Sequence, residues 1–105
     1  MVTYRIHQIK DIANTDYAFR SYDPNKFNFK DYECFGEGEF DAEAKTATEI
    51  CDIIFHVFNM RKPADFEGHS LSVSDIIEIT TNLTSSFYYC EPVGWKRISY
   101  GSNCQ

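Results

Sequence analysis

The sequence has no long uninterrupted apolar run, and its first residues contain no hydrophobic segment after a basic start. A membrane-spanning helix needs about 20 mostly apolar residues, and a secretory signal needs an apolar stretch of about 7–15. We therefore expect a cytoplasmic protein that does not insert into a membrane.

Positive charge is also scarce, because 10 Lys and Arg stand against 16 Asp and Glu, which gives a net charge of −6. Proteins bind the phosphate backbone of nucleic acids largely through cationic side chains. We expect no direct nucleic-acid binding. The chain has no glycine-rich phosphate loop or Walker pattern, so no cofactor is predicted.

Closely spaced cysteine pairs are absent, although the chain has four cysteines, which are Cys34, Cys51, Cys90 and Cys104. Structural zinc sites usually contain pairs such as C-x-x-C, and small disulfide frameworks belong to secreted proteins. The spacing therefore favours free thiols and predicts no metal site.

Apolar and aromatic residues are abundant, at 43% and 16% of 105 residues. This amount is sufficient for one hydrophobic core, and the length is typical of one domain. We therefore predict a single domain over residues 1–105.

Three stretches before residue 61 have distinct patterns. Residues 2–9 alternate between apolar and polar side chains, as do residues 31–40, where Gly36 and Gly38 favour a bent or bulged strand. The intervening residues 11–30 combine turn formers with aromatics, which predicts a long loop with a short strand near residues 17–20.

One helix is predicted over residues 47–60. Thr46 and Glu49 fit a capping box at its start, and Pro63 prevents it from continuing far beyond residue 60. An apolar stripe at helical spacing is expected to face the core, and its members are Ile50, Ile53, Ile54, Val57 and Phe58.

In the last third of the chain, β-branched and aromatic runs separated by turn residues predict three strands, at residues 76–80, 87–90 and 95–100. The expected fold class is α+β, with one main amphipathic helix packed on a mainly antiparallel twisted sheet that ends in a C-terminal β-meander.

Residues 68–75 concentrate an imidazole, three hydroxyls and a carboxylate. One hypothesis is catalytic: His69 deprotonates a serine while Asp75 orients the ring. The favoured interpretation is structural, because neighbours on extended backbone point apart and short polar side chains satisfy backbone N–H groups in turns. The positions of unknown role are Gly68, His69, Ser70, Ser72, Ser74 and Asp75.

A second candidate surface is acidic. Carboxylates recur at odd positions from Asp31 onward, and an extended strand would place them on one face about 7 Å apart. This row could dock a basic protein or mimic DNA phosphates, or it could be a solvated face that blocks edge pairing. The candidate binding residues are Glu33, Glu37, Glu39, Asp41 and Glu43.

The chain resembles the YodL-like family of small bacterial domains. The resemblance is sharpest where a helix ends in Phe58-Asn59 and a Pro-x-Asp-aromatic-x-Gly-His-Ser-Leu-Ser-x-Ser-Asp pattern follows, with later Tyr88-Tyr89 and Gly94-Trp95 pairs. Such domains occur in bacteria and on their mobile elements, sometimes within larger proteins. The resemblance implies an accessory or interaction domain, and no catalytic residues are established for the family.

The leading hypothesis is a non-enzymatic bacterial accessory or regulatory domain that binds an unidentified protein. Two alternatives remain at this point. One is a small hydrolase or transferase centred on residues 68–75, and the other is an acidic DNA-mimic inhibitor.

Overall fold

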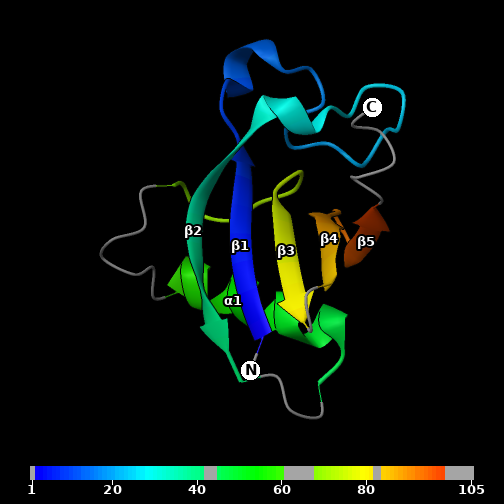
Figure 1. Cartoon of the computed structure of the whole chain (residues 1–105). Helices are drawn as coiled ribbons and strands as arrows, with labels where there is room; N and C mark the ends of the chain where they lie inside the picture. The colour runs from blue at the N-terminus through cyan, green and yellow to red at the C-terminus, as the bar shows by residue number, and fades with distance from the viewer. Residues whose placement is uncertain (1, 42–44, 61–67, 82–83, 99–105) are drawn as a thin grey trace.

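The computed structural model describes residues 2–41, 45–60, 68–81 and 84–98 (Figure 1). The predicted α+β class is confirmed: one helix packs on a five-stranded sheet with a C-terminal meander. In chain order the elements are β1 (Val2–Ile9), the short 3₁₀ helices η1 (Ile12–Asn14) and η2 (Phe29–Asp31), β2 (Tyr32–Phe40), α1 (Ala47–Met60), β3 (Ile76–Thr81), β4 (Thr84–Cys90) and β5 (Trp95–Ile98).

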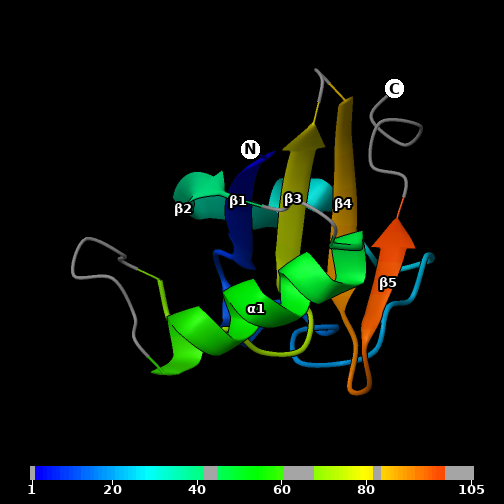
Figure 2. The same cartoon turned by 90° about the horizontal axis from the view of Figure 1, so that it is seen from below.

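The sheet has the order β2-β1-β3-β4-β5, and all four pairings are antiparallel. β2 and β5 are therefore its two edges. Figure 2 shows α1 lying across one face. None of the helices in the described ranges is long and apolar enough to span a membrane.

Helix α1 has the predicted bounds and the predicted cap. The Glu49 backbone N–H donates to Thr46 Oγ1 at 3.2 Å, and the Thr46 N–H donates to Glu49 Oε1 at 2.8 Å. This reciprocal pair is a capping box. The side chains of Ile50, Ile54 and Phe58 are buried against the sheet, whereas Val57 is 39% exposed.

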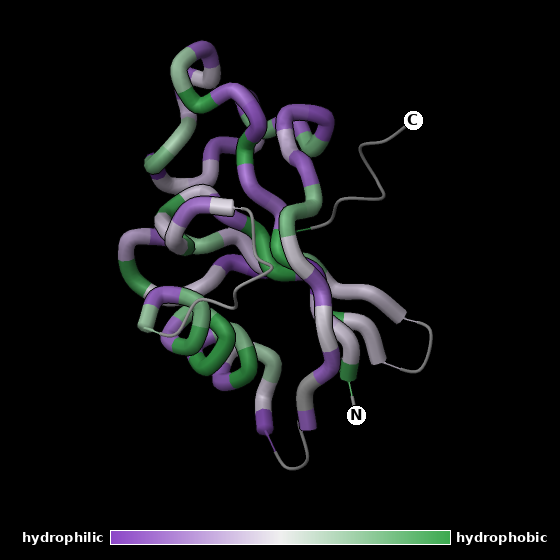
Figure 3. The backbone as a smooth tube through the Cα atoms, turned by 90° about the vertical axis from the view of Figure 1, so that its left-hand side faces the viewer, coloured by the Kyte–Doolittle hydropathy of each residue, from purple (hydrophilic) through white to green (hydrophobic). Residues whose placement is uncertain are grey.

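The sheet buries both faces, because successive strand residues point to opposite sides. Ile77 lies in the core under α1, while the preceding Ile76 belongs to a second core formed with aromatics of the loop over residues 10–31. That loop lies at one end of the sheet and alternates hydrophilic with hydrophobic segments (Figures 1 and 3). Its Tyr17, Phe27 and Phe29 pack beside Tyr32 and Tyr89.

The short strand predicted near residues 17–20 is wrong. This segment is a turn in which the Arg20 N–H donates to the Tyr17 carbonyl at 3.1 Å. Phe19 has a φ of 65°, which is left-handed backbone and incompatible with a strand. The loop is held by side-chain contacts to the sheet instead of by strand pairing.

The bulge predicted in β2 is confirmed. The register with β1 shifts between Ile6 and His7, which face Gly36 and Cys34, so Phe35 is the extra residue. Two positions along, Tyr4 faces Gly38, where a Cβ atom would lie 2.6 Å from the Tyr4 hydroxyl. Glycine at this position lets the Tyr4 ring lie against β2.

The C-terminal strands have slightly different bounds from those predicted. β4 begins at Thr84, three residues before the expected start, and pairs with β3 through Thr81. Some predictions concern residues that lie outside the described part of the chain. These residues are 61–67, which include Pro63, the loop at 82–83, and 99–105.

Candidate functional site

Residues 68–75 run from near the C-terminal end of α1 into β3. The Asn59 side chain of α1 pairs with both backbone groups of Leu71: its Oδ1 accepts from the Leu71 N–H at 2.7 Å, and its Nδ2 donates to the Leu71 carbonyl at 3.1 Å. Leu71 is buried in the core under α1. The middle of the segment is thus fixed to the helix.

The carboxylate of Asp75 fixes the C-terminal end of the segment to β1. Its Oδ2 accepts from the Ser72 N–H at 2.9 Å and from Gln8 Nε2 at 3.0 Å. Gln8 Nε2 also donates to the His69 carbonyl at 2.9 Å. Gln8 is fully buried and Asp75 is 2% exposed. This internal amide therefore joins β1 to both ends of the turn.

Ser74 attaches the same segment to the loop over residues 10–31. Its Oγ accepts from the Phe19 N–H at 2.9 Å, and its carbonyl accepts from the Tyr32 hydroxyl at 2.6 Å. Ser74 has a φ of 81° and is buried, while Phe19 is 51% exposed. Two residues in unfavourable left-handed backbone are thus bonded to each other.

Burial raises the pKa of Asp75 to about 6, although the hydrogen bonds from Gln8 and Ser72 and the nearby His69 lower it. Among the described residues no Lys or Arg forms an ion pair with this carboxylate. Desolvation of an anion without a counterion disfavours its charged form. The site therefore holds a carboxyl group that titrates in a mildly acidic range.

The imidazole and the hydroxyls do not form the arrangement of a nucleophile and its base. His69 Nδ1 lies 2.6 Å from the Ser70 carbonyl oxygen and 3.3 Å from Gln8 Nε2, so its described neighbours are a backbone carbonyl and an amide, not a serine hydroxyl. The Ser74 hydroxyl is occupied by the Phe19 N–H, and the buried Ser72 hydroxyl has no hydrogen-bond partner among the described residues. In these contacts the polar side chains form hydrogen bonds with backbone groups of the fold.

A second buried polar pair lies on the opposite face, under the aromatic loop. His7 Nε2 is 2.9 Å from Glu78 Oε1, and the His7 ring packs against Phe29 at 5.0 Å and Phe87 at 6.2 Å between centroids. Burial lowers the pKa of His7, while the hydrogen bond and the charge of Glu78 raise it. This pair joins β1 to β3.

The acidic residues do not form one row on one face. Glu33 faces Gln8, whereas Glu37 faces Arg5 and Glu39 faces Thr3. Because cross-strand partners share a face, and because the bulge shifts the alternation by one residue, Glu37 and Glu39 point away from the side of Glu33. Asp31 lies in η2, Asp41 follows β2, and Glu43 lies outside the described residues.

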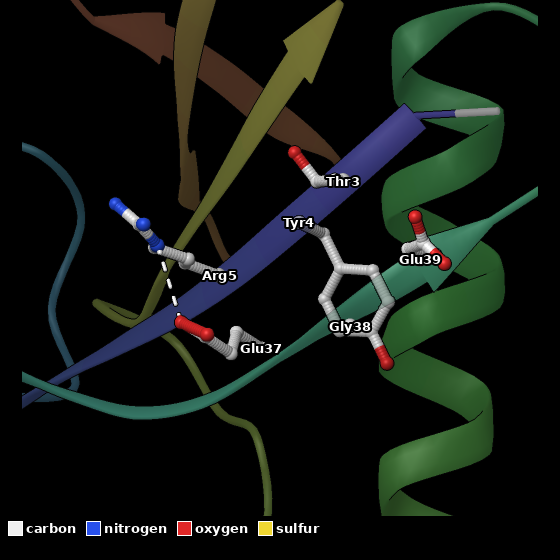
Figure 4. Close-up of a pocket in the computed structure, with 6 residues that line it drawn as sticks. All are labelled: Thr3, Tyr4, Arg5, Glu37, Gly38 and Glu39. Carbon is white, nitrogen blue, oxygen red and sulfur yellow. Dashed lines mark ion pairs between the residues drawn. The ribbon is translucent and has the colours of Figure 1, made fainter.

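A hollow of about 360 Å³ at the β1–β2 edge contains the two carboxylates that stay together (Figure 4). Arg5 Nε lies 3.4 Å from Glu37 Oε1, and both side chains are exposed. Within the described part of the chain, Glu39 has no ion pair. The hollow is lined by Thr3, Tyr4, Arg5, Glu37, Gly38 and Glu39.

Three residues that complete the 68–75 network were missed by sequence reasoning: Gln8, Phe19 and Tyr32. A signal existed for Gln8, because it continues the inward-facing positions of Tyr4 and Ile6 in β1. A polar side chain on an apolar face predicts a buried hydrogen-bonding group. No comparable local signal marks Phe19.

Among the described residues, no three His, Cys, Asp or Glu side chains form a group that could hold a metal ion. Cys34 is exposed, Cys51 and Cys90 are buried, and all three are free. Burial raises the pKa values of Cys51 and Cys90 to about 12, so both behave as small apolar side chains at neutral pH.

The model of the YodL-like domain family matches residues 3–100. The chain therefore belongs to the YodL-like family, as the 68–75 motif indicated. No curated protein and no solved structure matches it.

Proposed function

We propose that this chain is a non-enzymatic bacterial accessory or regulatory domain that works in the cytoplasm by binding another protein. The observation that carries the proposal is the pair Glu37 and Glu39, which are exposed, share one face of an edge strand and line a hollow. A partner with a basic surface fits this edge, because opposite potentials steer and orient association.

The arrangement of residues 68–75 supports a non-enzymatic role. Its buried polar residues are Ser74 and Asp75, and the side chain of each is hydrogen-bonded to backbone or to an amide, whereas the buried Ser72 hydroxyl has no partner among the described residues. A general base needs to lie within about 3 Å of the proton that it removes, and His69 Nδ1 is directed at a carbonyl oxygen. The hydrogen bond described for these hydroxyls, from the Phe19 N–H to Ser74 Oγ, stabilises the fold.

The division of the acidic row favours protein docking over DNA mimicry. A mimic of phosphates requires a regular series of carboxylates on one surface, and the bulge of β2 turns Glu33 away from Glu37 and Glu39. Glu37 and Glu39 lie beside the exposed Arg5, which gives a surface of mixed charge instead. Polar groups of this kind are typical of the solvent-accessible rim of a protein interface.

The test uses the tagged chain to capture a partner from bacterial lysate at about 0.05 M salt, followed by affinity measurement with the purified partner. Glu39→Gln is expected to weaken binding about two- to fivefold, as for an exposed ionic contact. Glu33→Gln removes the same charge from the opposite side of the same strand and should change the affinity by less than about twofold.

The salt dependence gives an independent check. Raising the salt from about 0.05 M to about 0.3 M shortens the screening length from about 14 Å to about 6 Å, so wild-type binding should weaken and the difference between wild type and Glu39→Gln should shrink. Equal effects of Glu33→Gln and Glu39→Gln would show that net charge alone is recognised and would remove this edge as the site.

A further inference from the structure

A second hollow lies at the opposite side of the molecule, between α1 and the turn that joins β4 to β5. It has a volume of about 180 Å³, and its walls include Asp52, Phe55, Glu91, Pro92 and Trp95. We propose that this groove binds one cationic side chain, a lysine or an arginine, presented by a partner protein. The inference rests on the proposed protein-binding function but concerns a different surface.

Two aromatic rings form the apolar part of the groove. The rings of Phe55 and Trp95 lie 6.0 Å apart at an angle of 79°. Trp95 Nε1 donates to Asp52 Oδ1 at 2.8 Å, which fixes the indole against the helix and places a carboxylate at its edge. A cation is attracted both to the face of a tryptophan and to a carboxylate, so this pair suits an ammonium or guanidinium group.

The negative charge of the groove is not neutralised by the described part of the chain. Neither Asp52 nor Glu91 forms an ion pair there. The nearest basic residues in sequence are directed elsewhere: Lys96 Nζ lies 5.8 Å from the centre of the Tyr22 ring, and Arg97 Nη2 contacts Ser86 Oγ at 3.4 Å. A cation supplied by a partner would meet the Asp52 carboxylate beside Trp95 without displacing an internal cation, whereas the Glu91 carboxylate accepts from the Tyr22 N–H.

The rigidity and size of the groove define its occupant. Both Glu91 carboxylate oxygens accept from the Tyr22 N–H, at 2.9 and 3.4 Å, and the Glu91 N–H donates to the Gly94 carbonyl. The volume is below the roughly 300–1,000 Å³ of pockets that enclose drug-sized ligands. Val93, in the same turn, is 91% exposed and offers an apolar contact beside the groove, as a protein partner requires.

The experiment uses Trp95 as the probe, because it is the only tryptophan in the chain. The full chain is titrated with acetyl-Gly-Gly-Arg-Gly-Gly-amide, with its lysine counterpart and with the neutral citrulline counterpart, while the indole emission is followed. We expect saturable changes with arginine and lysine, and at least about fivefold weaker binding of citrulline.

Asp52→Asn is the matched variant, because its side-chain oxygen can still accept from Trp95 Nε1 while the charge is lost. It should weaken the binding of the arginine and lysine peptides by about fivefold. Glu39→Gln, at the other edge of the sheet, should leave the indole response to these peptides unchanged. A citrulline peptide that binds as tightly as the arginine peptide, or an Asp52→Asn variant with wild-type affinity, would overturn the proposal. Loss of the response in Glu39→Gln would assign the peptide to the β1–β2 edge instead.

Discussion

Relative to the wild type, the Asp75→Asn variant is expected to gain about 2 kcal/mol of stability as the pH rises from about 4 to about 7. Burial raises the pKa of Asp75 from 3.8 to about 6. The folded state therefore holds this proton more tightly than the unfolded state. The resulting stability is complete below pH 3.8 and is lost as the pH rises through about 6. Asparagine cannot titrate, yet its oxygen can accept from both Ser72 and Gln8.

The measurement is the free energy of unfolding of both proteins by urea at several pH values from 4 to 7.5. The comparison between the two proteins is essential, because burial lowers the pKa of His7. A lowered histidine pKa makes stability rise with pH through about 6.5, which opposes the effect of Asp75. The difference between variant and wild type cancels this contribution, so a difference that does not change with pH would contradict the account.

Gln8→Leu is expected to destabilise the folded state by about 3 kcal/mol at pH 7. The substitution keeps a buried side chain of similar size but removes the amide that donates to Asp75 Oδ2 and to the His69 carbonyl. Asp75 Oδ2 keeps the Ser72 N–H but loses the amide, and the His69 carbonyl loses the amide N–H donated to it. The loss of a donor to a buried acceptor costs about 1–3 kcal/mol, and more when the acceptor is charged. The free energy of unfolding in urea checks this value.

Thr3→Leu is the control for Gln8→Leu, since it introduces the same side chain at an exposed position of the same strand. Substitutions at such positions usually change the free energy of unfolding by no more than about 0.5 kcal/mol. The effect of Gln8→Leu should also be smaller when Asp75 is already asparagine, because the abandoned acceptor is then neutral. A cost below about 1 kcal/mol in the wild-type background would show that the amide does not hold the segment to β1.

The parts of the fold that could be predicted depend on local patterns. Helix α1 was predicted with its bounds because Thr46 and Glu49 form a local cap and the apolar stripe has one period. The bulge of β2 was predicted because Gly36 and Gly38 interrupt an alternating pattern. Its consequence, the separation of Glu33 from Glu37, depends on the pairing partner β1 and could not be predicted from β2 alone.

The loop over residues 10–31 was harder, because its conformation is fixed by distant residues. Phe19 adopts left-handed backbone while its N–H donates to Ser74, which lies 55 positions away in the chain. Tyr22 is held in a similar way by Glu91. Propensity describes neighbours in sequence, and here tertiary contacts override it. The interpretation of residues 68–75 as structural stays a prediction, and their hydrogen-bond partners Gln8 and Tyr32 could be found only from the three-dimensional structure.

The most direct test of the central claim, that residues 68–75 hold the loop and the sheet together, is native-state hydrogen exchange of the Phe19 amide. This N–H donates to Ser74 Oγ at 2.9 Å on a half-exposed residue. We predict strong protection in the wild type, with an opening free energy close to that of global unfolding, and a loss of protection in Ser74→Ala while amides of β3 stay protected. Fast exchange of Phe19 in the wild type would show that the loop opens independently and would contradict the account.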